Sequence, residues 1–196
     1  MLKLAVVGKS PAAIRYPKDN IPDEEFDIKN IDFNVSPDFR IGEAEILRHG
    51  SDIAIIAYGA LVHEAEKAAE KLSKDDINVT VVNARFVKPL DKDLILNVIR
   101  DHNVIITVED HMLSGGFGSA LLESVSDSLN GQCKIIRLGI PDIFVEAGAR
   151  KILLKNLGLD ADGIFNKVME ESGKIVDYKP PESSIMNSES RIQKSE

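Results

Sequence analysis

The feature that most constrains the fold is the segment 79–91, where a short apolar strand leads through a loop into a helix. Residues 79–82 are all β-branched and none is charged, which is typical of a strand buried on both faces. Pro89 disfavours helix at Lys88, whereas Asp91 is suited to begin a helix by accepting hydrogen bonds from its first N–H groups. Because apolar residues then recur on one helical face, the segment predicts a strand followed by a helix that packs back on a sheet.

The same alternation of strand and helix continues through most of the chain. Apolar strands that alternate with amphipathic helices are typical of an α/β domain with three layers, a mostly parallel sheet and right-handed crossovers. We therefore predict this fold, with Asp160 at the start of the last helix. The other expected strands are 43–47, 52–58, 103–108 and 133–138, and two short helices are expected at 149–157 and 161–171.

Composition and charge exclude several classes of partner and site. A formal net charge of −8 argues against nucleic acid or an anionic membrane as the main partner, because both require a basic surface. Cys133 is the only cysteine, so there is no internal disulfide and no cysteine-rich zinc site. No apolar run approaches the roughly 20 residues of a membrane span, and the first seven residues are too short and too weakly basic for a signal peptide. We expect a soluble, cytoplasmic protein.

The two ends of the chain differ from this regular pattern. Residues 12–16 resemble a strand that Pro17 ends, but an acidic, proline-punctuated connector separates them from the rest. The last residues are rich in serine and charge, which predicts a disordered tail. We therefore divide the chain into a detached strand segment, a linker, an α/β domain and a tail. Their expected bounds are 1–17, 18–42, 43–172 and 173–196.

A glycine-rich loop between a strand and a helix is one candidate binding site. Gly115, Gly116 and Gly118 lie where backbone N–H groups at a helix N-terminus bind anions. The loop has neither the P-loop ending nor the dinucleotide-binding glycine pattern. A tight turn that lets helix and strand approach closely explains the same glycines, and we favour that interpretation over anion binding.

Charged residues near strand ends are the other candidates. Glu109, Asp110 and His111 follow a strand, and an acid beside a histidine suits a general base. Since no nucleophile or metal ligand accompanies them, we favour the interpretation that they are loop residues, which form caps and surface contacts. Arg15 with Lys18, and Arg85 with Lys88, form two pairs of cations that suit a phosphate, although such residues are commonly solvated surface charges.

Several motifs in register give the sequence a resemblance to a known family. Together they resemble the C-terminal part of the 1-deoxy-D-xylulose-5-phosphate synthases, which belong to the transketolase-like thiamine-diphosphate enzymes. The resemblance covers about residues 12–169. The motifs are AIRYP (13–17), NARFVKPLD (83–91), TVEDH (107–111), GGFGS (115–119), LGIPD (138–142) and LGLDADGI (157–164).

The resemblance implies a transferase that uses thiamine diphosphate and Mg²⁺. Members decarboxylate pyruvate and condense it with glyceraldehyde 3-phosphate, which supplies isoprenoid, thiamine and pyridoxal synthesis. Their cofactor site is built from a diphosphate-binding and a pyrimidine-binding domain. This sequence resembles only the last strand of the pyrimidine-binding domain, the linker and the transketolase C-terminal-like domain. We therefore expect that this chain alone binds no cofactor, holds no catalytic residue and is inactive.

Two substrate contacts carry over from the family to matching residues. The arginines of the AIRYP and NARFVKPLD motifs bind the phosphate of the aldehyde substrate, which assigns that role to Arg15 and Arg85. The family's subunits dimerise, so a homodimer is expected. Two alternatives remain open: a stand-alone dimerisation or anion-binding module, and the C-terminal domain of a 2-oxo acid dehydrogenase β subunit, against which the Arg85 motif argues.

Overall fold

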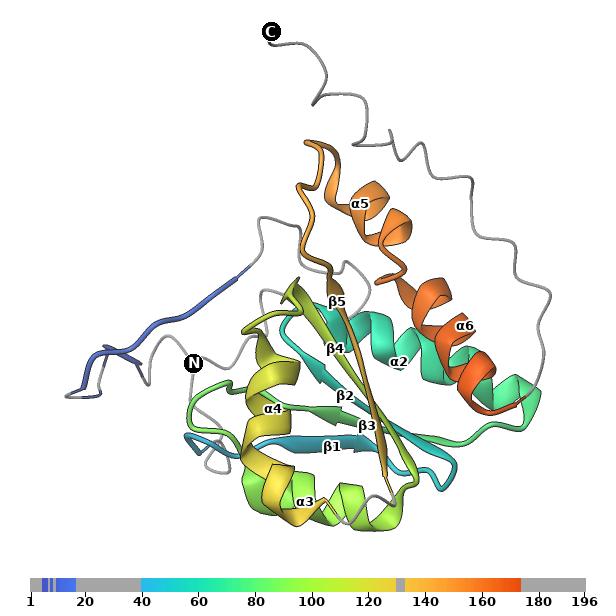
Figure 1. Cartoon of the computed structure of the whole chain (residues 1–196), viewed down its shortest axis with the longest axis horizontal. Helices are drawn as coiled ribbons and strands as arrows, with labels where there is room; N and C mark the ends of the chain where they lie inside the picture. Colours follow the sequence, from blue (N-terminus) through green and yellow to red (C-terminus); the bar gives the residue numbers. More distant parts are fainter. Residues whose placement is uncertain (1–4, 7, 9, 17–39, 130–132, 174–196) are drawn as a thin grey trace, which may run out of the picture.

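The computed structural model describes residues 5–6, 8, 10–16, 40–129 and 133–173. Five strands form one sheet in the order β1-β3-β2-β4-β5, in which β1 runs antiparallel and the other four are parallel (Figure 1). This confirms the predicted α/β fold with its mostly parallel sheet. The strands are β1 (Glu45–Arg48), β2 (Ile53–Tyr58), β3 (Val79–Asn83), β4 (Val104–Met112) and β5 (Lys134–Ile140).

Helices cover both faces of the sheet, and each face has its own apolar core. Side chains alternate across a strand, so Ile53 and Ile55 of β2 pack in the core beneath α2 and α6, whereas Ala54 and Ile56 pack in the core beneath α3 and α4. The three layers are visible in Figure 1. The helices are α2 (Leu61–Leu72), α3 (Lys92–Asp101), α4 (Phe117–Val125), α5 (Arg150–Asn156) and α6 (Ala161–Glu171), with single 3₁₀ turns at η2 (Ser73–Asp75) and η3 (Ser126–Ser128).

Two helices begin at the aspartates that the sequence predicts. The Asp91 carboxylate accepts a hydrogen bond from Leu94 N at 3.0 Å at the start of α3. The Asp160 carboxylate accepts one from Gly163 N at 2.9 Å at the start of α6. In both cases the side chain satisfies an N–H group that has no partner within the helix.

One strand is longer than predicted. We expected the strand at 103–108 to end before Glu109, but β4 continues to Met112. Glu109 pairs with Tyr58 of β2, and Met112 pairs with Ile140 of β5 after an irregularity in register. The acidic residues are therefore part of the strand, because neighbouring strands extend the ladder beyond the apolar run.

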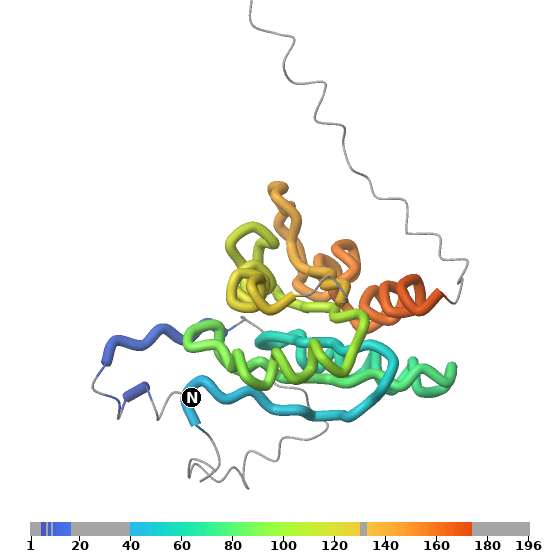
Figure 2. The backbone as a smooth tube through the Cα atoms, turned by 60° about the horizontal axis from the view of Figure 1, so that its bottom comes forward, coloured from blue at the N-terminus to red at the C-terminus, as the bar shows by residue number. Residues whose placement is uncertain are grey.

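The predicted strand at 12–16 is wrong for the described residues. Residues 10–16, which we call the arm, are exposed and form no strand. A strand requires a hydrogen-bonded neighbour, and no described strand lies beside the arm. Figures 1 and 2 show the arm extending to one side of the domain.

The remaining domain boundaries stay predictions. Most of the expected linker (18–42) and nearly all of the expected tail (173–196) lie outside the described residues. Among the helices of the described part, none combines the length and apolar character needed to cross a membrane.

Candidate functional site

A cleft of about 990 Å³ lies at the carboxyl ends of β2 and β3. Ligand sites of parallel α/β sheets form at this edge, because the loops that follow the strands converge there. Tyr58 and Gly59 contribute from the end of β2, and Asn83 with the loop 85–89 contributes from the end of β3. Residues 10–15 of the arm complete the wall, so the cleft joins parts of the chain that are far apart in sequence.

Arg85 is held at the end of β3 by contacts of its backbone and its side chain. Its backbone adopts a left-handed conformation, with φ +54°, and its N–H donates to the Asn83 side chain at 3.1 Å. Its guanidinium forms an ion pair with Glu45 of β1 and is only 19% exposed. The fold thus fixes Arg85 at the cleft from both its backbone and its side chain.

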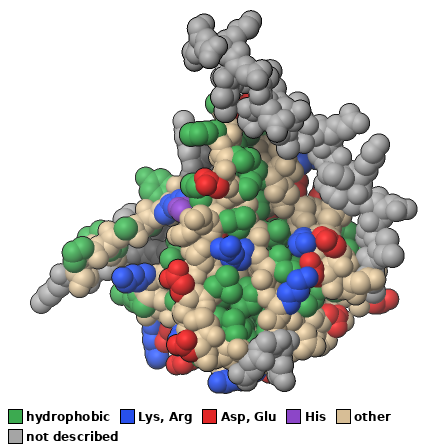
Figure 3. Space-filling model, in the orientation of Figure 1, with side chains coloured by type: hydrophobic (Ala, Val, Ile, Leu, Met, Phe, Trp, Pro, Cys, Tyr) green, Lys and Arg blue, Asp and Glu red, His purple; other side chains and the backbone are tan. Residues whose placement is uncertain are grey.

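Arg15 reaches the same cleft from the arm. Its Nη2 donates a hydrogen bond to the backbone oxygen of Asp110 in β4 at 2.7 Å. Arg15 and Arg85, to which the family resemblance assigns one phosphate, therefore line the same cleft, although 70 positions separate them. Figure 3 shows basic, acidic and histidine side chains where the arm meets the body of the domain.

Asp110 connects Arg15 to a residue that the sequence did not point to. Its Oδ2 accepts hydrogen bonds from Arg150 Nη2 at 2.8 Å and from Arg150 Nε at 3.2 Å. Both side chains are partly buried, with 30% of Asp110 and 25% of Arg150 exposed. Arg150 begins α5, 40 residues after Asp110, and no local motif in the sequence signals this contact.

Glu109 is fully buried and binds the glycine-rich loop. Its two carboxylate oxygens accept hydrogen bonds from Phe117 N at 2.5 Å and Gly118 N at 2.8 Å. A negative charge at a helix N-terminus is stabilised by the unpaired N–H groups and the helix dipole. The expectation that Glu109 caps a helix is correct, whereas its expected place in a surface loop is wrong.

The glycine-rich loop lies so close to β4 that larger residues would not fit at two of its positions, as the tight-turn interpretation predicts. A Cβ atom on Gly116 would lie 2.2 Å from Glu109 Oε2, and one on Gly118 would lie 2.7 Å from Thr107 Oγ1. Gly115 has φ +70°, a conformation that glycine adopts without strain. Because Glu109 already occupies the N–H groups of residues 117 and 118, the anion bound here is the chain's own carboxylate.

The remaining candidates are not joined into a catalytic group by the described residues. His111 is exposed, and its Nδ1 lies 3.2 Å from the backbone oxygen of Met112. Lys88 lines the cleft and is exposed, and Lys18 lies outside the described residues. Across the described part of the chain, no group of three or more His, Cys, Asp or Glu side chains is arranged to hold a metal ion.

Comparison with known proteins identifies one family and one set of relatives. Residues 42–164 match the family described as "Transketolase, C-terminal domain". The chain is 42% identical over 173 residues to 1-deoxy-D-xylulose-5-phosphate synthase 1 of Geobacter metallireducens, an alignment that covers 86% of this chain and 26% of that protein. It is 46% identical over 168 residues to 1-deoxy-D-xylulose-5-phosphate synthase 1 of Geobacter sulfurreducens, an alignment that covers 84% of this chain and 25% of that protein. The chain spans about a quarter of the length of these relatives.

Solved structures agree with this result. A split-gene transketolase, described as an inactive β4 tetramer, superposes with a TM-score of 0.64 at 30% identity, covering 71% of this chain and 46% of that one. A transketolase from Pichia stipitis superposes with a TM-score of 0.50 at 19% identity, covering 67% of this chain and 18% of that one. This second likeness supports the fold alone.

Proposed function

The chain belongs to the transketolase C-terminal domain family and corresponds to the C-terminal region of 1-deoxy-D-xylulose-5-phosphate synthases, and we propose that its role is to bind the phosphate of the aldehyde substrate. In the complete enzyme, pyruvate loses CO₂ and condenses with glyceraldehyde 3-phosphate to give 1-deoxy-D-xylulose 5-phosphate, a precursor for isoprenoids, thiamine and pyridoxal. The alternative of a 2-oxo acid dehydrogenase β subunit is less well supported, because the relatives carry the synthase name.

The observation that carries this proposal is the shared cleft of Arg15 and Arg85. Guanidinium groups suit phosphate because their N–H donors match its oxygens and their charge is permanent. Arg85 is fixed by its ion pair with Glu45. Arg15 contacts a neutral carbonyl and makes no ion pair with any described residue, so its charge is available to an anion.

Thiamine diphosphate and Mg²⁺ are the cofactor and the metal ion that the family resemblance implies for the complete enzyme. Mg²⁺ is bound by oxygen ligands, commonly carboxylates together with phosphate groups, and among the described residues no group of three or more His, Cys, Asp or Glu side chains could hold a metal ion. We propose that other segments of the enzyme hold the cofactor and the metal ion. Accordingly, we propose that this chain alone does not catalyse the condensation. We also propose that the complete enzyme works in the cytoplasm.

A direct assay tests the inactivity of the isolated chain. The purified chain is supplied with pyruvate, glyceraldehyde 3-phosphate, thiamine diphosphate and Mg²⁺, and formation of the product is measured alongside calorimetric titration of the cofactor. We expect neither turnover nor cofactor binding. Turnover would show that the chain contains a thiamine site, and the proposal would then be wrong.

A chimera tests the phosphate role. This chain replaces the matching segment of the Geobacter sulfurreducens synthase, and we expect turnover to be retained. Arg85→Ala should raise KM for glyceraldehyde 3-phosphate by about tenfold or more, since a charged hydrogen bond is lost, while KM for pyruvate is unchanged. Arg100→Ala is the matched control, because Arg100 is an exposed arginine of α3 that bonds only Asn97 among the described residues. Equal KM values for Arg85→Ala and Arg100→Ala would contradict the proposal.

We also propose that the chain self-associates, as a homodimer. One structural relative at 30% identity is described as a tetramer. Sedimentation velocity over a range of concentrations should give the mass of a dimer, and a monomer at all concentrations would contradict this part of the proposal.

A further inference from the structure

Arg15 depends on one described contact for its position in the cleft. The arm is exposed along its whole length and pairs with no described strand. Of the described hydrogen bonds, the one that joins the arm to the domain is from Arg15 Nη2 to the Asp110 backbone oxygen, at 2.7 Å. The orientation of this guanidinium is therefore set by where β4 presents the carbonyl of Asp110.

That carbonyl lies in an irregular part of β4. The pairing of β4 with β5 is regular up to Val108 and resumes at Met112, so the ladder does not fix residues 109–111 on this side. Glu109 is held by its hydrogen bonds to the start of α4. Asp110 is held by Arg150, which binds its carboxylate through two nitrogens at 2.8 and 3.2 Å.

We propose that Arg150 is a positioning residue for the phosphate-binding Arg15, and that it acts through Asp110. This inference rests on the proposed function of Arg15. The two-point contact fixes the residue whose carbonyl orients Arg15. It also neutralises the Asp110 carboxylate, which belongs to the same residue as that carbonyl.

The charge of Asp110 explains why this neutralisation matters. An unpaired carboxylate beside Arg15 would compete with the substrate for the guanidinium and would repel a phosphate dianion. Such effects are stronger at a partly buried position than in water, because the effective dielectric constant is lower. With Arg150 in place, Asp110 supplies a carbonyl acceptor to Arg15 without a net negative charge.

Titration of the full chain tests this inference. Inorganic phosphate and glyceraldehyde 3-phosphate are titrated into the protein and binding is followed by ³¹P NMR, which detects millimolar affinities. The variants are Arg15→Ala, Arg150→Ala, Arg150→Lys and the double variant Arg150→Ala/Asp110→Asn, with Arg100→Ala as the control. Circular dichroism of each variant shows whether it has folded.

We expect Arg15→Ala to weaken phosphate binding by about tenfold, because a charged hydrogen bond to the phosphate is lost. We expect Arg150→Ala to weaken it by about fivefold, because Arg150 acts on the phosphate only through Asp110 and Arg15. Arg150→Lys should lose less than Arg150→Ala. The double variant should regain at least about twofold over Arg150→Ala, because it removes the unpaired charge. A general loss of structure at α5 would not be reversed by the second substitution.

The outcomes separate this inference from the proposed function. If the wild-type chain binds neither ligand, or if Arg15→Ala binds as wild type does, the phosphate site itself is wrong and this inference fails with it. If Arg15→Ala weakens binding and Arg150→Ala does not, the phosphate site stands and the role of Arg150 is overturned. A double variant as weak as Arg150→Ala would overturn the part played by the Asp110 charge.

Discussion

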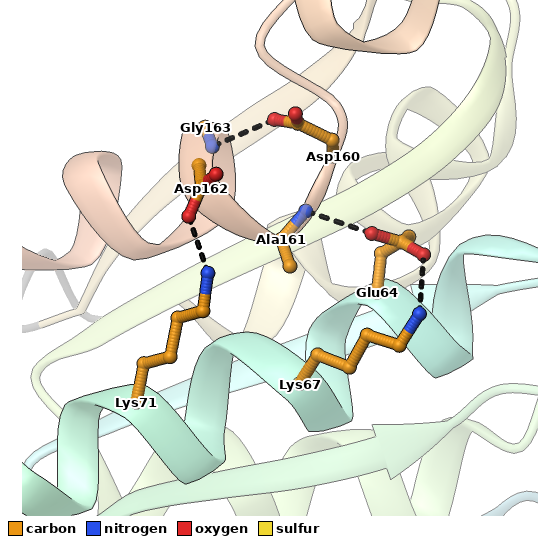
Figure 4. A network of polar contacts seen from close by, with 7 residues as sticks. All are labelled: Glu64, Lys67, Lys71, Asp160, Ala161, Asp162 and Gly163. Carbon is orange, nitrogen blue, oxygen red and sulfur yellow. Dashed lines mark hydrogen bonds and ion pairs between the residues drawn. The ribbon is translucent and has the colours of Figure 1, made fainter. Parts of the chain in front are cut away.

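The helices α4 and α6 both begin against carboxylates, but the two N-termini are built differently. At α4 a single carboxylate from a strand, Glu109, is fully buried and binds two N–H groups. At α6 two carboxylates accept hydrogen bonds from the N-terminal N–H groups (Figure 4). Asp160 accepts from Gly163 N, and Glu64 of α2 accepts from Ala161 N, both at 2.9 Å.

The surroundings of the two sites differ as well. The carboxylate of Glu64 also pairs with Lys67 on the same helix, and Lys71 of α2 pairs with Asp162 of α6. These groups are partly or largely exposed, so each contributes little alone. At α4 the carboxylate is buried instead, and it belongs to the residue that precedes Asp110, whose carbonyl accepts from Arg15. The N-terminus of α4 is therefore held by a buried carboxylate, whereas that of α6 is held by several partly exposed groups.

The largest expected effect is that of Glu109→Ala. It leaves two buried N–H groups without an acceptor, which should lower the free energy of unfolding by about 3 kcal/mol. Urea denaturation measures this loss, with Glu64→Ala as the matched control at α6. A loss at Glu109 no greater than that at Glu64 would remove the distinction between the two sites.

The next effect concerns the space around the buried carboxylate. Gly116→Ala places a Cβ atom 2.2 Å from both Glu109 Oε2 and the Met112 backbone oxygen. We expect a loss of about 2 kcal/mol or more, since the buried loop must shift to relieve this overlap. Gly115→Ala is the matched control, because a Cβ atom there meets nothing within 4 Å and only its φ of +70° is unfavourable. Its cost should be about 1 kcal/mol. Thermal and urea unfolding of both variants test this order.

The two helix starts also show which contacts a sequence reveals. The sequence predicts Asp160 as the cap of α6, because a side-chain cap acts three residues away, within the same turn. The sequence predicts that Glu109 is a capping residue in a surface loop, and it misses the burial of Glu109, since this depends on α4 packing over β4. The Asp110–Arg150 pair spans 40 residues and has no periodic pattern to mark it. Conversely, the composition of residues 12–16 predicts a strand, although strand formation requires a neighbour that the described residues do not supply.

A smaller effect is expected from the cap that lies within α6. Asp160→Ala removes the acceptor for Gly163 N, and should cost about 1 kcal/mol, as is usual for a helix N-cap. Asp160→Asn retains an acceptor oxygen and should recover most of that loss. Equal losses for the two variants, measured by urea denaturation, would show that the charge of Asp160 and not its hydrogen bond stabilises the helix start.

The smallest effect lies at the other end of α6, where Glu171 joins the helix to β5. Lys134 Nζ binds the Glu171 carboxylate at 2.6 Å and Lys167 Nζ binds it at 3.0 Å, and the Lys134 hydrogen bond is the main cause that lowers the pKa of Glu171. A carboxylate with a lowered pKa stabilises the folded state at neutral pH, and this contribution is lost as the pH falls through the lowered value. We therefore expect Glu171→Gln to cost about 0.5 kcal/mol at neutral pH, as for a surface ion pair, and the difference from wild type to shrink in acid.

Glu170 of the same turn is more exposed and pairs with Lys167 alone among the described residues, so Glu170→Gln is the control and should show a smaller difference. Thermal unfolding at neutral and acidic pH measures both variants, and a difference for Glu171→Gln that grows in acid would contradict the assignment, because it would mean that the protonated carboxyl is the form that stabilises α6.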